Sequence, residues 1–157
     1  MKVKDLMTPH PTTVDREALL QTAMEVMIEH GIRHLPVVDA GGGRLLGMLT
    51  DRDVRSAAIA PAIAEYLSAE QRRRLRPVTE ALGTLRVGDV MTWDVVTIAP
   101  DAPIAQAAAV MFEARFGSLP VVDGGKLVGI VTERDVLKAL AATLPSVRGI
   151  DPDTFLW

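Results

Sequence analysis

Two pairs of side chains have the types and spacing to bind a charged or hydroxylated ligand. Thr50 precedes Asp53 by three residues, and Thr132 precedes Asp135 in the same way. Each pair falls where a helix is expected to begin, so the threonine brings a hydroxyl and backbone N–H groups to a position where the helix dipole favours an anion. The carboxylate can accept charge-assisted hydrogen bonds. The alternative is structural, because the threonine can cap the helix and the aspartate favours its first turn.

These pairs belong to an internal repeat. The matching segments are Met-Thr at 7–8 and 91–92, Leu-Pro-Val-Val-Asp at 35–39 and 119–123, and Gly-x-x-Thr-x-Arg-Asp at 47–53 and 129–135. The offset is 84 residues (91 − 7) before a Gly-rich turn and 82 (129 − 47) after it. A deletion confined to a turn is typical of a duplicated unit, because turns tolerate length changes that packed elements do not. We therefore expect each copy to bury its apolar face against the other, with paired sites at their junction.

Hydrophobic periodicity predicts the same elements in each copy: strand, helix, strand, turn, strand and helix. In the first copy Asp15 is expected to cap a helix that ends before Gly31, and Asp101 is expected at the start of the equivalent helix. Residues 35–38 and 45–49 are apolar or β-branched runs joined by glycines, which predicts a hairpin. A second helix follows each hairpin.

Composition excludes several classes of site and partner. The 157 residues carry a net charge of −3, with 48% hydrophobic and 24% charged residues, as is ordinary for a soluble globular protein. Without a basic field we expect no nucleic-acid partner. The absence of cysteine excludes disulfides, thiolate metal sites and a cysteine nucleophile. No apolar run approaches the ~18 residues of a membrane span, and no signal peptide is evident, so we expect a cytoplasmic protein without a membrane partner.

The repeat divides the chain into four parts. We expect a first motif at residues 1–58, a helical linker at 59–86, a second motif at 87–142 and a C-terminal tail at 143–157. Four arginines crowd the linker at 72–76. They indicate either a patch for phosphate, nucleic acid or an acidic partner, or simply a solvated helix face.

The repeated motifs resemble the CBS motif, named from cystathionine β-synthase. Two in tandem are similar to a CBS pair, or Bateman module, of the stand-alone bacterial or archaeal type. The resemblance covers nearly the whole chain outside the linker and tail. It implies an α/β (α+β) fold in which two motifs, each a small sheet flanked by two helices, pack around a pseudo-two-fold axis. It also implies two clefts that bind an adenosine derivative such as AMP, ADP or ATP as a regulatory ligand, with no obligatory cofactor.

By this resemblance the first cleft binds a nucleotide. Asp53 can accept both ribose hydroxyls, Arg33 matches phosphate geometry with its guanidinium fork, and backbone groups just before Pro36 face adenine. His34 is either a ligand contact or an incidental surface side chain. The residues expected at this site are Thr12, Thr13, Val14, Ile32, Arg33, His34, Pro36, Thr50, Arg52 and Asp53.

The second cleft is expected to bind phosphorylated ligands more weakly. It keeps a ribose-type carboxylate at Asp135, but Gly117 and Ser118 stand in place of Arg33 and His34. The phosphate-facing cation is therefore missing. The residues expected at this site are Val96, Thr97, Ile98, Phe116, Gly117, Ser118, Pro120, Thr132, Arg134 and Asp135.

Three functions of different classes follow. The first is a regulatory protein that senses an adenosine-containing ligand and acts on an unidentified partner protein. The second is a structural homodimerisation module with empty clefts. The third, an enzyme, is disfavoured because the three histidines show neither a nucleophile–base pairing nor metal-ligand spacing. Arg33 beside Asp53 favours sensing, since a structural module needs no such pair. The motif faces of the family and the apolar end at 155–157 predict a homodimer.

Overall fold

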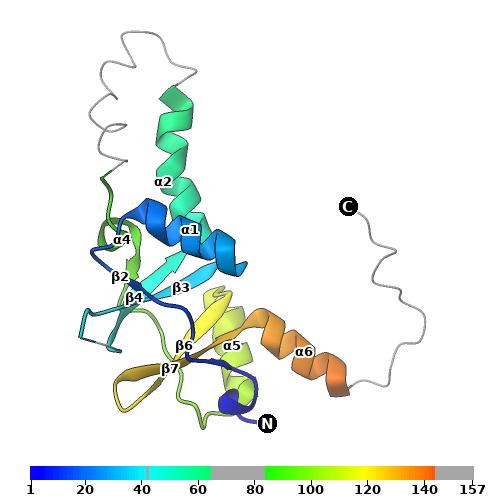
Figure 1. Cartoon of the computed structure of the whole chain (residues 1–157). Coiled ribbons are helices and arrows are strands. Elements are labelled where there is room, and N and C mark those ends of the chain that lie inside the picture. The colour runs from blue at the N-terminus through cyan, green and yellow to red at the C-terminus, as the bar shows by residue number, and fades with distance from the viewer. Residues whose placement is uncertain (42, 65–83, 144–157) are drawn as a thin grey trace.

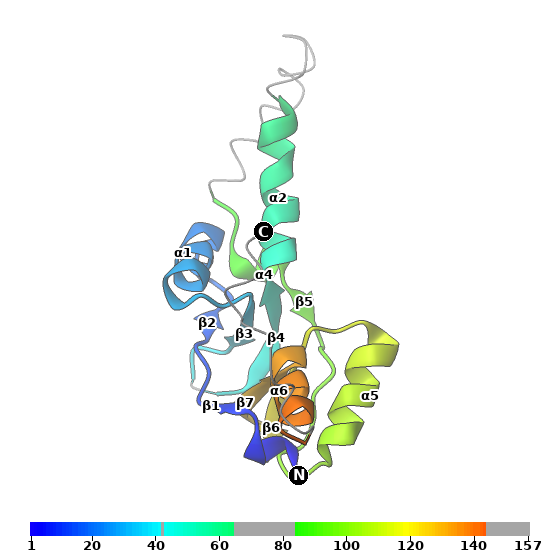
Figure 2. The same ribbon diagram turned by 90° about the vertical axis from the view of Figure 1, so that its right-hand side faces the viewer.

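The two copies of the repeat form two small sheets, each covered by its own pair of helices (Figure 1). The computed structural model describes residues 1–41, 43–64 and 84–143. Strands and helices at matching places in both copies confirm the expected α/β fold. Figure 2 shows α5 and α6 side by side, and α2 extending away from both sheets. The arginines of the expected linker helix and the apolar end of the tail lie outside the described residues.

The elements follow one another in the same order in both halves, except that β2 has only an isolated bridge, Ile98 with Val121, as its counterpart in the second half. The first half contains the 3₁₀ helix η1 (Val3–Asp5), β1 (Thr8–Pro9), β2 (Val14–Asp15), α1 (Leu20–His30), β3 (His34–Val38), β4 (Leu45–Thr50) and α2 (Asp51–Ala64). The second contains α4 (Val87–Val90), β5 (Thr92–Trp93), α5 (Ile104–Ala114), β6 (Ser118–Asp123), β7 (Lys126–Thr132) and α6 (Glu133–Thr143). The hairpins and the second helices begin where the sequence predicted them.

The first helices begin later than the sequence predicted. α1 starts at Leu20 rather than just after Asp15, and no side chain caps its N-terminus. Asp15 instead accepts a 2.7 Å hydrogen bond from the backbone N–H of Glu17 in the preceding turn. α5 likewise starts at Ile104, after the turn that contains Asp101. In both cases the turn ahead of the helix is bound to the other half of the chain.

Each half contributes its opening segment to the other half. β1 pairs antiparallel with β7, giving a sheet of order β1-β7-β6, and β5 pairs antiparallel with β4, giving the order β2-β3-β4-β5. Figure 1 shows the blue η1 beside α5 and the green α4 beside α1. We call residues 3–9 and 87–93 the exchanged segments. Because the exchange is reciprocal, each sheet contains strands from both halves.

The same backbone hydrogen bonds hold both exchanged segments. The N–H of Val3 donates to the carbonyl of Ala102, and the N–H of Val87 donates to that of Ala18, both over 2.9 Å. The two bonds are related by the 84-residue offset of the repeat (87 − 3 and 102 − 18). The exchange is therefore a property of the repeated unit.

Surface charges add to the first of these attachments. Lys2 and Lys4 each form a 2.8 Å ion pair with Asp101 in the turn before α5. The hydrogen bonds from Lys2 and then Lys4, together with their charges, lower the pKa of this carboxyl to about 2. Exposed ion pairs of this kind contribute little to stability. Asp101 thus lies in the turn before α5, bound to Lys2 and Lys4, and not at the start of the helix where the sequence predicted it.

The exchanged segments also complete the hydrophobic cores. Val87 and Met91 are buried in the first core beside Leu35, and Val3 is buried in the second core beside Leu119. Burying a side chain of this size stabilises a fold by about 1.5–3 kcal/mol. Neither core is complete without residues from the other half.

Gly47 and Gly129 allow the exchanged strands to approach. A β-carbon at Gly47 would overlap the carbonyl oxygen of Thr92, and one at Gly129 would lie 2.5 Å from the sulfur of Met7. The glycine of the Gly-x-x-Thr segment and the Met-Thr pair of the other copy are therefore two sides of one contact. Their presence in the repeat is explained by packing.

Gly47→Ala is expected to lower the free energy of unfolding by about 1–3 kcal/mol, because the new methyl group must displace the backbone of the paired strand, and Gly129→Ala is expected to lower it by less, because the methyl group there meets first the side chain of Met7. Urea unfolding followed by circular dichroism measures this change. Gly41→Ala is the matched control, since a β-carbon there meets nothing within 4 Å. Equal stability of the three variants and the wild type would contradict the proposed contact.

Candidate functional site

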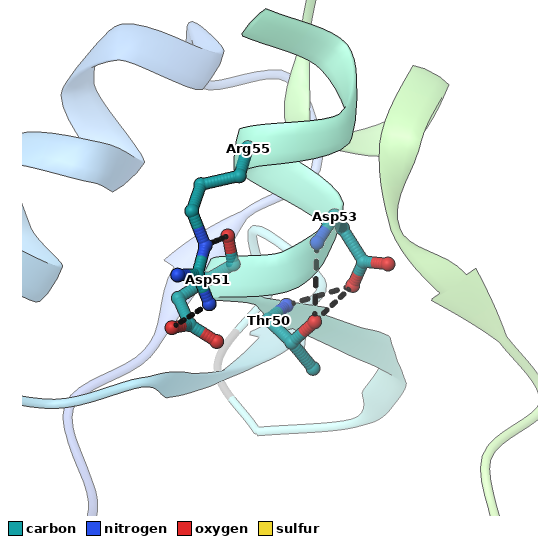
Figure 3. Close-up of polar contacts among 4 residues, drawn as sticks. All are labelled: Thr50, Asp51, Asp53 and Arg55. Atoms are coloured by element: carbon teal, nitrogen blue, oxygen red, sulfur yellow. Dashed lines mark hydrogen bonds and ion pairs between the residues drawn. The ribbon is translucent and has the colours of Figure 1, made fainter. Parts of the chain in front are cut away.

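Thr50 and Asp53 form a reciprocal cap at the start of α2 (Figure 3). The Oδ2 atom of Asp53 accepts hydrogen bonds from the backbone N–H of Thr50 at 2.9 Å and from its hydroxyl at 2.7 Å. The N–H of Asp53 donates in return to the threonine hydroxyl oxygen over 3.3 Å. This arrangement satisfies donors that a helix start otherwise leaves unpaired. Oδ1 of Asp53 takes no part in the cap.

The second half repeats this cap at the start of α6. Thr132 and Asp135 make the same three hydrogen bonds, at 2.9, 2.7 and 3.3 Å. The structural interpretation of these residues is therefore correct in both halves. One oxygen of each aspartate remains outside the cap, so the role of Asp53 and Asp135 in ligand binding stays a prediction.

Strand register places Arg33 and His34 next to the first helix start. His34 opens β3 as the Cα partner of Thr50, and the carbonyl of Arg33 accepts a 3.0 Å hydrogen bond from the N–H of Asp51. The side chain of Arg33 is exposed, whereas that of His34 is half-buried. Burial, and next the charge of Arg33, lower the pKa of the imidazole, and nearby carboxylates oppose this shift.

The second half keeps the backbone of this arrangement but changes its side chains. Ser118, which is buried, is the Cα partner of Thr132, and the carbonyl of Gly117 accepts a 3.1 Å hydrogen bond from the N–H of Glu133. The imidazole of His34 lies against Gly117, where a β-carbon would be 3.0 Å from its Nε2 atom. The sequence did not predict this contact between the two halves. The one sign of it was the glycine at position 117, which leaves room for a close neighbour.

The strand residues predicted to complete the clefts differ in accessibility. Val14 and Ile98 are buried and pair with β3 and β6, so their side chains belong to the cores. Thr97 is exposed and lines a hollow of about 210 Å³ together with Leu45 and Arg44 of the first half. Arg44 was not among the predicted residues. The hollow shows that the segment after β5 remains close to the other half.

The remaining predicted residues fall into two groups. Pro36 and Pro120 are fully buried, and Ile32 packs against the first core, so these side chains serve packing. Those with exposed or half-buried side chains are Thr12, Thr13, Arg52, Val96, Phe116 and Arg134.

A second hollow, of about 530 Å³, lies between the end of α5 and the start of α6. Phe112, Arg115 and Glu133 are among the residues that line it. Arg115 ends α5 with φ 58° in the left-handed region, where the first half has Gly31 with φ 62°. For a residue other than glycine this backbone costs about 1–3 kcal/mol. Arg115 thus lies near the helix start at which no counterpart of Arg33 exists.

Metal-binding clusters and membrane-spanning helices are both absent from the part of the chain that the structure describes. Across residues 1–41, 43–64 and 84–143, no group of three or more histidine, aspartate or glutamate side chains is placed to hold a metal ion. The helices in this part of the chain are all too short or too polar to cross a membrane.

Known sequences match this chain along both repeats. The sequence model of the CBS domain matches residues 3–60 and again residues 87–142. A CBS domain-containing protein of Dictyostelium discoideum is 36% identical over 146 residues, which cover 92% of this chain and 94% of that protein. Other relatives are longer: at 33% identity over 135 residues, the chain spans only 23% of a homoserine O-acetyltransferase of Methanococcoides burtonii.

Solved structures match the fold over most of its length. CBSX2 of Arabidopsis thaliana, solved in complex with AMP, has a TM-score of 0.73 at 28% identity and covers 90% of this chain and 96% of its own. The CBS domain pair of protein MJ0100, in complex with 5′-methylthioadenosine and S-adenosyl-L-methionine, has a TM-score of 0.72 at 27% identity, with 92% and 98% covered. The chain therefore belongs to the CBS domain family, and its two halves are a tandem pair of these domains.

Proposed function

We propose that this CBS pair is a regulatory module that binds an adenosine-containing ligand at the starts of α2 and α6. The observation that carries the proposal is the repeated cap, in which Asp53 and Asp135 each keep one carboxylate oxygen outside the hydrogen bonds to threonine. Two similar CBS pairs bind AMP or S-adenosyl-L-methionine and 5′-methylthioadenosine, which supports this ligand class. The proposal assigns the chain no reaction of its own.

At the first helix start, the residues supply each kind of contact that a nucleotide needs. Oδ1 of Asp53 accepts from the ribose hydroxyls, while Oδ2 stays in the cap and fixes the carboxylate. The carbonyl of Arg33 is bound to the start of α2 and its side chain is exposed, so its guanidinium can attract phosphate, as does the positive end of the helix dipole. The first cleft is therefore the stronger anion site, because Gly117 gives the second no equivalent cation.

The second function proposed is assembly into a homodimer, which is compatible with sensing. Ile28 on α1 is 72% exposed, and Phe112 on α5 is 84% exposed. These two residues are equivalent in the repeat, since 112 − 28 is the 84-residue offset. Leu137 and Leu140 on α6 are also more than half exposed. Apolar side chains at matching helix positions favour a contact with a second copy through the helices.

AMP at about 100 times its dissociation constant is expected to stabilise the protein by about 2.7 kcal/mol, or about 5–11 °C in melting midpoint.

Asp53→Asn should weaken AMP binding about ten- to a hundredfold, because a charge-assisted hydrogen bond contributes about 1.5–3 kcal/mol. Asparagine is used because it can still accept the bonds of the cap, whereas alanine would also destabilise α2. Arg33→Ala should weaken AMP but leave adenosine unchanged. Calorimetry measures all of these affinities.

Two comparisons make this test specific. Arg16→Ala removes a positive charge on the turn that contacts Gly88, and it should leave AMP binding unchanged. Asp135→Asn should affect AMP less than Asp53→Asn does. No response to any adenine compound would reject sensing in favour of the structural function, and equal losses from the two asparagine variants would reject the ranking of the sites.

Light scattering is expected to give a mass of about twice 16.9 kDa for the wild type at micromolar concentration. The double variant Ile28→Ser and Phe112→Ser should shift the protein toward the monomer, because it removes apolar area from the proposed contact. The exposed Val96→Ser, away from the helices, serves as the control. A wild-type monomer would contradict the dimer.

A further inference from the structure

The imidazole of His34 connects the two halves of the molecule at a point between their helix starts. Its backbone pairs with Thr50, which caps α2, and its ring lies against Gly117, whose carbonyl accepts from the first N–H of α6. A β-carbon on Gly117 would lie 3.0 Å from Nε2 and 3.2 Å from Cε1 of the ring. The ring therefore fills the space that a side chain at position 117 would need.

Charged groups from both halves face this ring. Arg33 precedes it on the chain, Asp51 and Asp53 lie in the first turn of α2, and Glu133 opens α6. Burial and Arg33 lower the pKa of the ring, and the three carboxylates act in the opposite direction without reversing the shift. The imidazole is consequently neutral in the unliganded protein at neutral pH.

The second half has no equivalent of this residue. Ser118, the counterpart of His34, is buried and does not titrate, and Gly117, the counterpart of Arg33, has no side chain. A single imidazole is thus adjacent to both proposed anion positions. An anion bound at either helix start adds negative charge near the ring, which favours its protonated form.

We propose that His34 makes the binding of phosphate-bearing ligands proton-linked: on binding, the neutral imidazole takes a proton from solvent and becomes an imidazolium that faces the phosphate. This inference rests on the proposed function and adds a regulatory input to it. Since the ring gains a proton on binding, affinity is greatest below the pKa of the unliganded ring and falls as pH rises through that of the liganded ring. Each unit by which the ligand raises the pKa changes the affinity about tenfold.

Calorimetry with AMP from about pH 6 to about pH 8, in two buffers of different ionisation enthalpy, measures the affinity and the number of protons taken up. The phosphate of AMP itself titrates near pH 6, so the comparison is between the wild type and His34→Gln under identical conditions. The wild type should lose about three- to tenfold more affinity across this range than His34→Gln and should take up more protons. Adenosine, which carries no phosphate, should show no such difference, and the exposed His30→Gln should behave as the wild type.

Gly117→Ala tests the geometry separately. The new methyl group must move the ring off the loop toward solvent, so NMR titration of His34 should show its pKa rising toward the ordinary value in the unliganded protein. An unchanged titration curve in this variant would overturn the placement of the ring. Binding of AMP with equal proton uptake in the wild type and His34→Gln would overturn the inference alone, whereas the failure of every adenine compound to bind at any pH would overturn the proposed function as well.

Discussion

The close contact between Gly47 and the strand at Thr92, repeated between Gly129 and Met7, is the constraint on which the rest of this structure depends. It allows each opening segment to pair with the sheet of the other half and to complete the core there. Both sheets are thereby held in one fixed relation. This relation brings His34 of the first half against the loop that precedes β6 in the second.

The caps at α2 and α6 show how one residue can serve the fold and a binding site together. Each aspartate uses one oxygen to hold the threonine that starts its helix, and this bond fixes the direction of the other oxygen. A ligand that meets a carboxylate already held in place loses less conformational entropy on binding. The two proposed sites differ in their cations, because Arg33 lies beside one helix start and Arg115 near the other on a strained backbone.

Much of the fold could be predicted from local sequence signals. The repeat, the glycine turn between β3 and β4, and the threonines that start α2 and α6 act over a few residues and are visible in the sequence. The late start of α1 was not predictable from Asp15, because the first residue of the helix binds a segment far away in the chain: the N–H of Leu20 donates to the carbonyl of Leu85, 65 positions later (85 − 20).

The geometry of the candidate site was predictable in part for the same reason. Thr50, Asp53 and their equivalents followed from motif and spacing, and strand register then brought Arg33 and His34 beside them. The position of the imidazole against Gly117 depends on how the two halves pack, and Pro36 and Pro120 proved to be fully buried. Contacts of this kind are set by tertiary structure, and a pattern within one copy carries little information about them.

The reciprocal exchange has a consequence for the synthesis of the protein. Val87 and Met91 fill part of the first core, so the first half to leave the ribosome has an incomplete core until these residues have been made. Contacts between such distant parts of a chain form slowly, since the entropy of closing the loop must be lost before the contact stabilises anything. Although the sequence reads as two separate units, we expect the two cores to form together in one cooperative step.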